Sequence, residues 1–198
     1  MTRPKLILVG GGGHALSCLD LIAMANEFNL MGYVALKASA EFEALGIQFL
    51  GNDDELPNLS QIIPNFHVAI GQIKTAKPRV TAFERLQSLQ CVLPVIKSDD
   101  ASVSSNASLA EGVMVGRNAI VNSGAIVSGN CIINSGAIIE HGVKIGKHCH
   151  IAPGAIILGD SVIGECSFVG AGTIVREGVT IAPNSIIGAG ERVMRDYV

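Results

Sequence analysis

Residues 133–157 read INSGAIIEHGVKIGKHCHIAPGAII, and an aliphatic residue returns in this stretch at every sixth position. The same spacing continues in both directions over sixteen consecutive positions: Val103, Leu109, Val115, Val121, Val127, Ile133, Ile139, Ile145, Ile151, Ile157, Ile163, Val169, Val175, Ile181, Ile187 and Val193. A helix repeats every 3.6 residues and a strand every two, so neither explains a period of six. This period is typical of a parallel β-helix, in which short strands and turns wind around a prism.

Each six-residue unit has the same internal pattern. A small residue stands two places before the aliphatic one, as at Ala119, Ala125, Ala137 and Ala155. Residues two apart on a strand share a face, so both point inward and the residue between them points out. The other three positions are rich in Gly, Asn, Ser, Asp and Pro, which favour turns. With three units per coil, the repeats predict about five coils, stacked roughly 4.8 Å apart.

The first half of the chain follows a different pattern, in which apolar strands alternate with amphipathic helices. We expect strands at 5–9, 32–36, 48–50, 67–70 and 91–95, one helix carrying Leu16 to Phe28, and another over 74–90. Strand, glycine loop and helix in this order are typical of a small Rossmann-like α/β unit with a mostly parallel sheet. The sequence therefore predicts an α/β domain over 1–97 and a β-helix over 98–198.

The composition excludes several classes of protein. A net charge of −3 and a pI near 5.9 give no reason to expect a nucleic-acid partner. No stretch reaches the roughly 18 apolar residues of a membrane span, and the first strand is not preceded by a signal peptide. The five cysteines form no CxxC pair and are interpreted as buried small residues of a reducing compartment. We therefore expect a cytoplasmic protein that does not insert into membranes.

Two motifs give the chain a resemblance to a known family. The first is LVGGGGHA at 8–15, and the second is INSGAIIEH at 133–141, followed by HIAPGA at 150–155. Together with the repeats, they resemble the hexapeptide-repeat acyltransferases, in the branch of sialic acid O-acetyltransferases and nucleotide-aminosugar N-acetyltransferases. The resemblance covers nearly the whole chain. It implies a left-handed β-helix, a homotrimer, and acetyl-CoA as co-substrate without a metal.

His141 is the residue that the resemblance marks as the general base. Acyl transfer from a thioester needs a base to take the proton of the attacking amine or hydroxyl, and imidazole titrates near neutrality. Taken alone, a histidine at such a turn is more often a solvated surface residue. In the family a carboxylate usually follows this histidine, whereas here the next residue is Gly142. Glu140 is the candidate replacement, and a plain surface carboxylate explains it equally well.

His150 lies nine residues after His141, which is half of an eighteen-residue coil. The two histidines therefore lie on different sides of one prism and meet only if prisms pack side by side. This matches the family's trimers, whose active sites lie between prisms and in which the histidine matching His150 contacts acetyl-CoA. Its outward strand position explains His150 equally well as a surface residue, and we expect His148 to be a surface residue too.

Small residues recur one coil apart in the last coils. Gly170-Ala171-Gly172 and Gly188-Ala189-Gly190 are eighteen residues apart, and their stacking predicts a smooth strip along which a thin ligand can reach backbone amides. The resemblance implies that Ala171 and Ala189 contact the pantetheine arm of the coenzyme. It also places Asn134 near the catalytic corner. Turn formation alone is the alternative explanation for all three residues.

The glycines at 10–13 follow a strand and open a helix, where backbone N–H groups can hold a phosphate. The resemblance implies that Gly12, Gly13 and His14 bind the nucleotide-linked sugar, together with Gly71 after a later strand. The full GxGxxG pattern of a dehydrogenase is not matched. Family members that bind uridine nucleotides often carry an acidic pair after the second strand, where this chain has Ala35-Leu36, so the nucleotide stays open.

The leading hypothesis is an acetyl-CoA-dependent sugar acetyltransferase that N-acetylates a nucleotide-linked amino sugar in surface polysaccharide or glycan biosynthesis. O-acetylation of a sialic acid or another sugar is the first alternative. A γ-carbonic-anhydrase-like zinc lyase is another, although His141, His148 and His150 lack the ligand spacing of that class. The last is a non-catalytic trimeric scaffold, which the end of the sequence at Val198 favours, because family members usually continue with a segment over the coenzyme.

Overall fold

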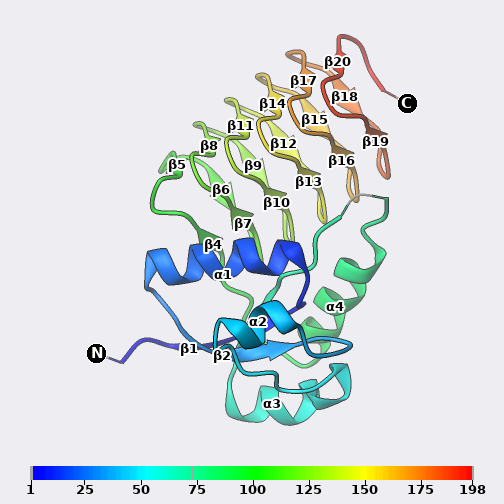
Figure 1. Ribbon diagram of the computed structural model, residues 1–198. Helices are drawn as coiled ribbons and strands as arrows, with labels where there is room; N and C mark the ends of the chain where they lie inside the picture. The colour runs from blue at the N-terminus through cyan, green and yellow to red at the C-terminus, as the bar shows by residue number, and fades with distance from the viewer. Residues whose placement is uncertain (1, 73, 198) are drawn as a thin grey trace.

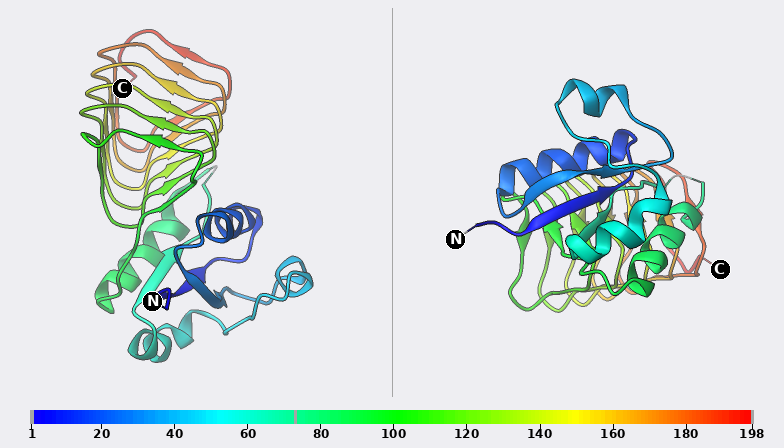
Figure 2. Two further views of the ribbon diagram at one scale, coloured as in Figure 1. Left: turned by 90° about the vertical axis from the view of Figure 1, so that its left-hand side faces the viewer. Right: turned by 90° about the horizontal axis from the view of Figure 1, so that it is seen from below.

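The computed structural model describes residues 2–72 and 74–197. An α/β domain lies against the first coils of a long β-helix, with helices α1 (Gly13–Ala25) and α4 (Lys77–Ser88) closest to the coils (Figure 1). The chain's second half winds away from this domain coil by coil, as the side view of Figure 2 shows. Both predicted fold classes are therefore confirmed, and the division expected at residues 97 and 98 falls between two strands of the β-helix.

The α/β domain is built on a three-stranded parallel sheet. Its strands β1 (Lys5–Val9), β2 (Asn29–Val34) and β3 (Asn65–Val68) lie in the order β2-β1-β3. Leu6 and Leu8 of the central strand pack in the same cluster as α1, whereas Ile7 and Val9 pack with α4 and α3 (Leu56–Ile62) on the opposite face. Both faces are covered, which explains why β1 is a continuous apolar run rather than an alternating one.

The remaining elements of this domain are short. Helix α2 (Ala40–Ala44) and the 3₁₀ turn η1 (Asp53–Glu55) connect β2 to α3. The strands expected at 48–50 and 91–95 are reduced to isolated bridges, Phe49 with Tyr33 and Val92 with Asn65. The helix expected over 74–90 begins at Lys77, because Pro78 favours the first turn of a helix.

The β-helix begins with β4 (Ile96–Lys97), and sixteen further two-residue strands follow within the described residues. They are β5 (Ser102–Val103), β6 (Ser108–Leu109), β7 (Met114–Val115), β8 (Ile120–Val121), β9 (Ile126–Val127), β10 (Ile132–Ile133), β11 (Ile138–Ile139), β12 (Lys144–Ile145), β13 (His150–Ile151), β14 (Ile156–Ile157), β15 (Val162–Ile163), β16 (Phe168–Val169), β17 (Ile174–Val175), β18 (Thr180–Ile181), β19 (Ile186–Ile187) and β20 (Arg192–Val193). Each ends on one of the sixteen aliphatic residues that the sequence singled out. Pairing of Ile132 with His150 and Ile133 with Ile151 confirms eighteen residues per coil.

The prism has three faces, each a parallel sheet. The docked face contains β4, β7, β10, β13, β16 and β19, and its outward Ile96, Met114 and Ile132 pack against α1. The isoleucine face contains β5, β8, β11, β14, β17 and β20, and its four middle strands point half-exposed isoleucines outward. Strands β6, β9, β12, β15 and β18 form the third face. The turn containing Asn134 joins the docked and isoleucine faces, and the turn containing His141 joins the isoleucine and third faces.

A buried arginine forms hydrogen bonds across the interface between the two domains. Arg79 of α4 is fully buried and donates to the backbone oxygen of Asn130, to Gln72 Oε1 at 2.5 Å and to the backbone oxygen of His148 at 2.7 Å. The His148 ring also packs edge-on against Phe83, with ring centroids 5.6 Å apart. His148 is therefore half-buried, because the α/β domain covers one side of its ring, and the expectation of a plain surface residue holds only in part.

The cysteines fit the sequence interpretation only in part. Cys18, Cys131 and Cys149 are buried, whereas Cys91 and Cys166 are partly exposed, and all five are free thiols. In the described residues, no helix combines the length and apolar character needed to cross a bilayer.

Candidate active site

The glycine loop at residues 10–13 lies where the parallel sheet opens. Strand β1 is central: the chain passes from it to β2 on one side and then crosses over to β3 on the other, and a crevice opens at the carboxyl ends of the strands. Gly10 has a φ of +130°, and a Cβ there would lie 2.6 Å from the backbone oxygen of Ala69. Only glycine fits this close approach. The loop thus brings the backbone to the edge of the crevice.

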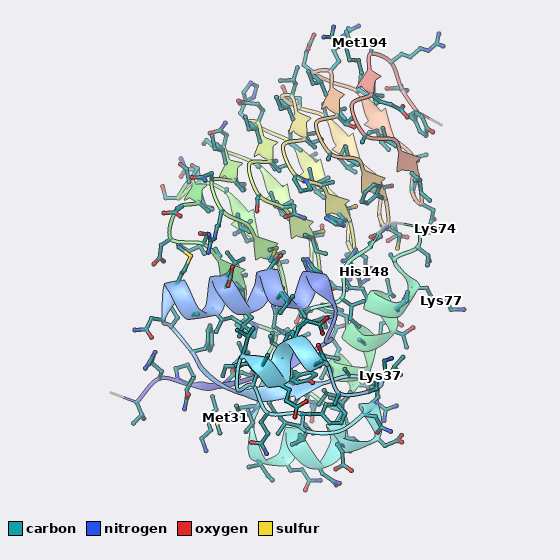
Figure 3. The ribbon with its side chains drawn as sticks, viewed as in Figure 1. Met31, Lys37, Lys74, Lys77, His148 and Met194 are labelled. Carbon is teal, nitrogen blue, oxygen red and sulfur yellow. The ribbon has the colours of Figure 1, made fainter. Side chains whose placement is uncertain are left out.

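Two clefts flank this loop. The outer cleft, of about 1020 Å³, has apolar walls from the strand ends and includes Ala35 and Leu36. Its charged groups are Lys37 and Lys77, which lie on the same side of the molecule (Figure 3), and the carboxylates of Glu41 and Asp53. The inner cleft, of about 650 Å³, lies between the glycine loop and the docked face of the β-helix. Both clefts share the glycines at 10–12, so one extended ligand can occupy them together.

The amino end of α1 points at these clefts without a cap of its own. No side chain caps the helix, and its first turn carries no acidic residue. Unpaired N–H groups and the helix dipole therefore favour an anion at this position. A Cβ on Gly12 or Gly13 would meet nothing within 4 Å, so both glycines leave the loop open to a ligand.

The inner cleft brings together residues that are far apart in the sequence. It is lined by Gly12, Gly13, His14, Gly71, Asn134 and His150, six of the residues that the sequence analysis named. A Cβ on Gly71 would lie 3.2 Å from the Cβ of His14, so glycine at 71 lets His14 approach. The rings of His14 and His150 have centroids 6.2 Å apart. The expected sugar-binding and coenzyme-binding residues therefore meet at one place.

His150 is buried, because the α/β domain covers its outward strand position. Its Nδ1 lies 2.9 Å from the backbone oxygen of Gln72, and its Nε2 lies 3.1 Å from Nδ2 of Asn134. The Oδ1 of Asn134 accepts from the N–H of Ser135 at 2.8 Å, which fixes the orientation of the amide. From these partners we assign the proton of His150 to Nδ1, so that Nε2 accepts from Asn134.

Burial keeps the histidines of this region neutral. Burial, with smaller contributions from the nearby His14 and Arg79, lowers the pKa of His150 to about 3, against the hydrogen bond to the Gln72 backbone oxygen, which raises it. Burial and then Arg79 lower the pKa of His14 to about 4. The pKa of His67, inside β3, is also lowered to about 4 by burial. Near neutral pH these side chains therefore act as uncharged hydrogen-bonding groups rather than as cations.

These shifts predict acid destabilisation. In the unfolded chain these histidines take up protons near pH 6.5, whereas in the folded chain they do so only near pH 3 to 4. The free energy of unfolding is therefore fully retained above pH 6.5 and decreases as the pH falls below that value. Each histidine is expected to reduce the free energy of unfolding by up to about 3 kcal/mol at pH 4. Chemical denaturation at pH 7 and pH 4 measures the loss. His67→Gln is expected to reduce it by about a third, whereas Ser88→Gln, at an exposed position without a titrating group, leaves it unchanged; equal losses in all three proteins contradict the assignment.

His141 lies outside both clefts, on the turn between the isoleucine and third faces. Its side chain is exposed, and its ring lies over Gly159 of the next coil, where an added Cβ would be 2.7 Å from Nε2. The backbone N–H of His141 donates to Glu140 Oε2 at 3.3 Å. Within one chain, His141 and His150 are thus separated by the width of the isoleucine face, as their nine-residue spacing predicts.

Ala171 and Ala189 stack at the corner of the prism that also carries Asn134. The N–H of Gly190 donates to the backbone oxygen of Ala171 at 2.8 Å, and both alanines are exposed. A Cβ on Gly172 or Gly190 would meet nothing within 4 Å. The corner is therefore a strip of small residues that leads away from the inner cleft.

Several residues of the region were not identified from the sequence. Lys37, Lys77 and Asp53 line the outer cleft, and Gln72 orients His150 through its backbone oxygen. Gln72 follows the glycine that was identified, but Lys37, Lys77 and Asp53 stand in no recognisable motif. The described residues contain no cluster of three or more His, Cys, Asp or Glu side chains that could hold a metal ion.

Comparison with known proteins extends over both domains. The PglD N-terminal domain model matches residues 5–83, and the bacterial transferase hexapeptide (six repeats) model matches 128–159 and 160–190. PerB from Caulobacter crescentus, solved with CoA and GDP-perosamine, is 31% identical, with a TM-score of 0.89 over 98% of this chain and 90% of that chain. A histidine-to-asparagine mutant of the perosamine N-acetyltransferase from the same organism, also with CoA and GDP-perosamine, is 30% identical, with a TM-score of 0.90.

A second enzyme shares the same arrangement. The acetyltransferase domain of PglB from Neisseria gonorrhoeae is 28% identical, with a TM-score of 0.90 over 99% of this chain and 94% of that chain. It has also been solved with acetyl coenzyme A. A search of curated protein sequences found no match.

An α/β domain with an open glycine loop, docked on a left-handed β-helix of six-residue repeats, defines a class of acyltransferases. The chain belongs to this class, the hexapeptide-repeat acyltransferase family, in the group whose members carry a PglD-type N-terminal domain.

Proposed function

We propose that the protein transfers the acetyl group of acetyl-CoA to the amine of a nucleotide-linked amino sugar, in surface polysaccharide or glycan biosynthesis. The observation that carries the proposal is the continuity of the two clefts around the glycine loop, ending at His14 and His150. Its support is the similarity over 98% of the chain to an enzyme solved with CoA and GDP-perosamine. The free thiols and the use of acetyl-CoA favour the cytoplasm as its site of action.

The nucleotide is proposed to occupy the outer cleft, with its phosphates at the amino end of α1. Gly12 and Gly13 present backbone N–H groups there, and Lys37 and Lys77 supply positive charge. The apolar walls at Ala35 and Leu36 accept the flat face of a base. The sugar then extends into the inner cleft, past Gly71 and towards His14.

Acetyl-CoA is proposed to lie along the strip of small residues. Ala171 and Ala189 would contact the pantetheine arm, because their methyl groups leave the backbone accessible. Asn134 and His150, at the lower end of the strip, would contact the acetyl end. This places the thioester at the mouth of the inner cleft, beside the proposed position of the amine.

The site is proposed to be completed by a second copy of the chain in a homotrimer. His141 and the inner cleft lie at opposite edges of the isoleucine face. If three prisms turn these apolar faces towards a common axis, the His141 edge of one chain meets the Asn134 edge of the next, and the ring of contacts closes. The half-exposed isoleucines at 120, 138, 156 and 174 would then be buried.

In that arrangement His141 acts as the general base. The amine nitrogen forms a bond to the acetyl carbonyl carbon and the carbon–sulfur bond breaks, while a ring nitrogen of His141 takes the amine proton and returns it to the departing thiolate. The other residue expected in catalysis, Glu140, contacts the backbone N–H of His141 and is proposed to hold this turn. Positioning and proton transfer are sufficient for such a reaction.

The experiment that tests the function measures release of the CoA thiol. Purified protein is given acetyl-CoA and a panel of uridine-, guanosine- and thymidine-linked amino sugars, with free sialic acids as hydroxyl acceptors. We expect turnover with a nucleotide-linked amino sugar and an N-acetyl product by mass spectrometry. Turnover only with sialic acids assigns O-acetylation instead, and the absence of turnover, together with no acetyl-CoA binding by calorimetry, supports the scaffold.

Filling the glycine loop is expected to block the acceptor. Gly12 has a φ of −97°, which any residue adopts, and it borders both clefts. Gly12→Trp should therefore fold but raise the KM for the sugar nucleotide at least about tenfold, which corresponds to about 1.4 kcal/mol. Ser88→Trp, at an exposed position on α4, is the matched control. Unchanged kinetics in Gly12→Trp would remove the loop from the acceptor site.

A further inference from the structure

The turn that carries His141 is stacked on a turn that carries a carboxylate. His141 and Gly142 lie one coil before Gly159 and Asp160, and the N–H of Asp160 donates to the backbone oxygen of His141 at 3.0 Å. The two turns are therefore in direct register, with no residue between them. A side chain that points from one turn towards the other, along the prism axis, enters the space between the two turns, here called the gap.

Two side chains enter this gap from opposite directions. The His141 ring extends over Gly159, where an added Cβ would lie 2.5 Å from Cε1 and 3.1 Å from Nδ1. The Asp160 side chain extends over Gly142, where an added Cβ would collide with Oδ1 and lie 3.2 Å from Cγ. Gly159 thus accommodates the His141 ring, and Gly142 accommodates the Asp160 side chain. The imidazole and the carboxylate therefore enter the same gap from opposite coils, with no ion pair between these two described side chains.

From this juxtaposition we propose that Asp160 is the positioning residue of His141, taking the place of the carboxylate that family members usually carry directly after this histidine. The inference rests on the proposed function. A rotation of the Asp160 side chain within the gap brings its carboxylate to one ring nitrogen and holds the proton there, so that the other nitrogen faces the amine and accepts its proton. A carboxylate beside the ring also stabilises the imidazolium that forms when the amine proton is taken up.

The charged side chains of Glu140 and Arg176, which lie near the gap, already have hydrogen-bond or ion-pair partners. Glu140 faces the backbone N–H of its neighbour His141, at 3.3 Å. On the following coil, Arg176 is paired with Glu177 at 3.3 Å and donates to the backbone oxygen of Met194 at 3.2 Å. The ion pairs found between described residues join Arg176 to Glu177 and Arg117 to Asp20, and neither includes Asp160. The Asp160 carboxylate is thus available to the imidazole.

The backbone permits the carboxylate to be moved between coils. Gly142 has a φ of +67° and Asp160 a φ of +59°, so both occupy the same left-handed turn position. The corresponding residues of the adjacent coils, Gly124 and Gly178, have φ values of +76° and +70°. Aspartate is thus already accommodated at this turn position, and exchanging Gly142 and Asp160 should change the backbone little.

The first test is Asp160→Asn, which keeps the shape and tolerates the left-handed turn. We expect kcat for acetyl transfer to fall about 10- to 100-fold, part of the contribution of a general base. The KM values for acetyl-CoA and the sugar nucleotide should stay within about twofold, since neither ligand is held by Asp160. The melting temperature and the oligomeric state should match the wild type. A loss that appears in KM or in stability contradicts a positioning role.

The second test relocates the carboxylate. The double variant Gly142→Asp with Asp160→Gly removes the collision and places the carboxylate on the residue after His141. It should recover most of the kcat that Asp160→Gly alone loses, which a merely structural aspartate would not do. Asp100→Asn, at an exposed turn of the first coil, is the comparison, with kcat expected to stay near that of the wild type.

The outcomes separate this inference from the proposed function. No thiol release by the wild type with any acceptor overturns the proposed function and this inference together. Wild-type turnover with an unchanged kcat in Asp160→Asn overturns this inference alone. The same holds if Asp100→Asn lowers kcat as much as Asp160→Asn does.

Discussion

Replacing His141 with alanine is expected to reduce kcat by about 10²- to 10⁴-fold, the range that a general base contributes. The amine then has no positioned group to take its proton as the bond to the acetyl carbon forms. Stability should change by less than about 0.5 kcal/mol, because His141 is exposed in the chain and its ring is not hydrogen-bonded to other described residues. Steady-state thiol release and thermal melting measure the two effects. Activity near that of the wild type would falsify the assignment of the base.

Mixing two impaired variants, assayed at a sugar-nucleotide concentration well below the KM of Gly12→Trp, tests whether His141 acts on a neighbouring chain. His141→Ala retains its clefts, and Gly12→Trp retains its histidine. Random trimers of the two should recover about a quarter of the wild-type activity, since half of the clefts are intact and half of those meet an intact histidine. Co-expression with two different tags isolates the mixed trimers, each of which has one complete site out of three and should show about a third of the wild-type activity. No recovery in mixed trimers would place the whole site within one chain.

The β-helix could be predicted almost completely because its signal repeats. Each of the sixteen periodic aliphatic residues from Val103 to Val193 occupies the second position of a strand, as predicted. The eighteen-residue coil also contained a signal that the sequence analysis did not use. Residue 142 plus one coil is 160, so the missing carboxylate beside His141 could have been sought at Asp160. The same arithmetic correctly stacked Ala171 on Ala189.

The α/β domain was predicted less accurately, because its short strands have no such repetition. Residues 48–50 and 91–95 are apolar enough for strands, yet each forms only one bridge, to Tyr33 and to Asn65. Their apolar residues serve the packing between helices and sheet instead, as Leu50 and Cys91 do beside α4. A short apolar run does not distinguish these two uses.

The contacts between the domains could not be predicted at all. Arg79 and the backbone oxygen of Asn130 are 51 residues apart, and Gln72 and Cys166 are 94 apart. Neither pair belongs to a periodic pattern, and a basic residue on a helix is expected to face water. The partial burial of His148 and the burial of His150 follow from these contacts, which the six-residue pattern does not contain, and both residues were therefore expected at the surface.

Replacing Arg79 with methionine is expected to destabilise the protein by about 3 to 5 kcal/mol, the range for removing one member of a buried polar network. Methionine fills a similar volume, so the loss comes from hydrogen bonds rather than from a cavity. Gln72 Oε1 and the backbone oxygens of Asn130 and His148 lose their donor where water does not replace it. Each unsatisfied buried acceptor costs about 1 to 3 kcal/mol.

The removal of a buried charge opposes this loss of stability in Arg79→Met. Burial lowers the pKa of Arg79, which shows that its charge is costly to hold in the interface, and methionine removes that cost. The hydrogen bonds should still dominate, because three acceptors depend on a single guanidinium. Gln72 also holds His150 through its backbone oxygen, so loosening this residue should raise the KM for acetyl-CoA as well.

Denaturant unfolding of Arg79→Met and of Arg85→Met measures the difference. Arg85 lies on the same helix and is exposed, so its replacement should change the free energy of unfolding by less than about 0.5 kcal/mol. If the two variants are equally stable, the buried guanidinium does not hold the domains together. If Arg79→Met instead unfolds in two steps, with the β-helix surviving the α/β domain, the arginine is what couples the two domains into one cooperative unit. The buried residues of the β-helix core all lie between Val113 and Val193, and Val95 is the described apolar residue of the first domain that packs against them.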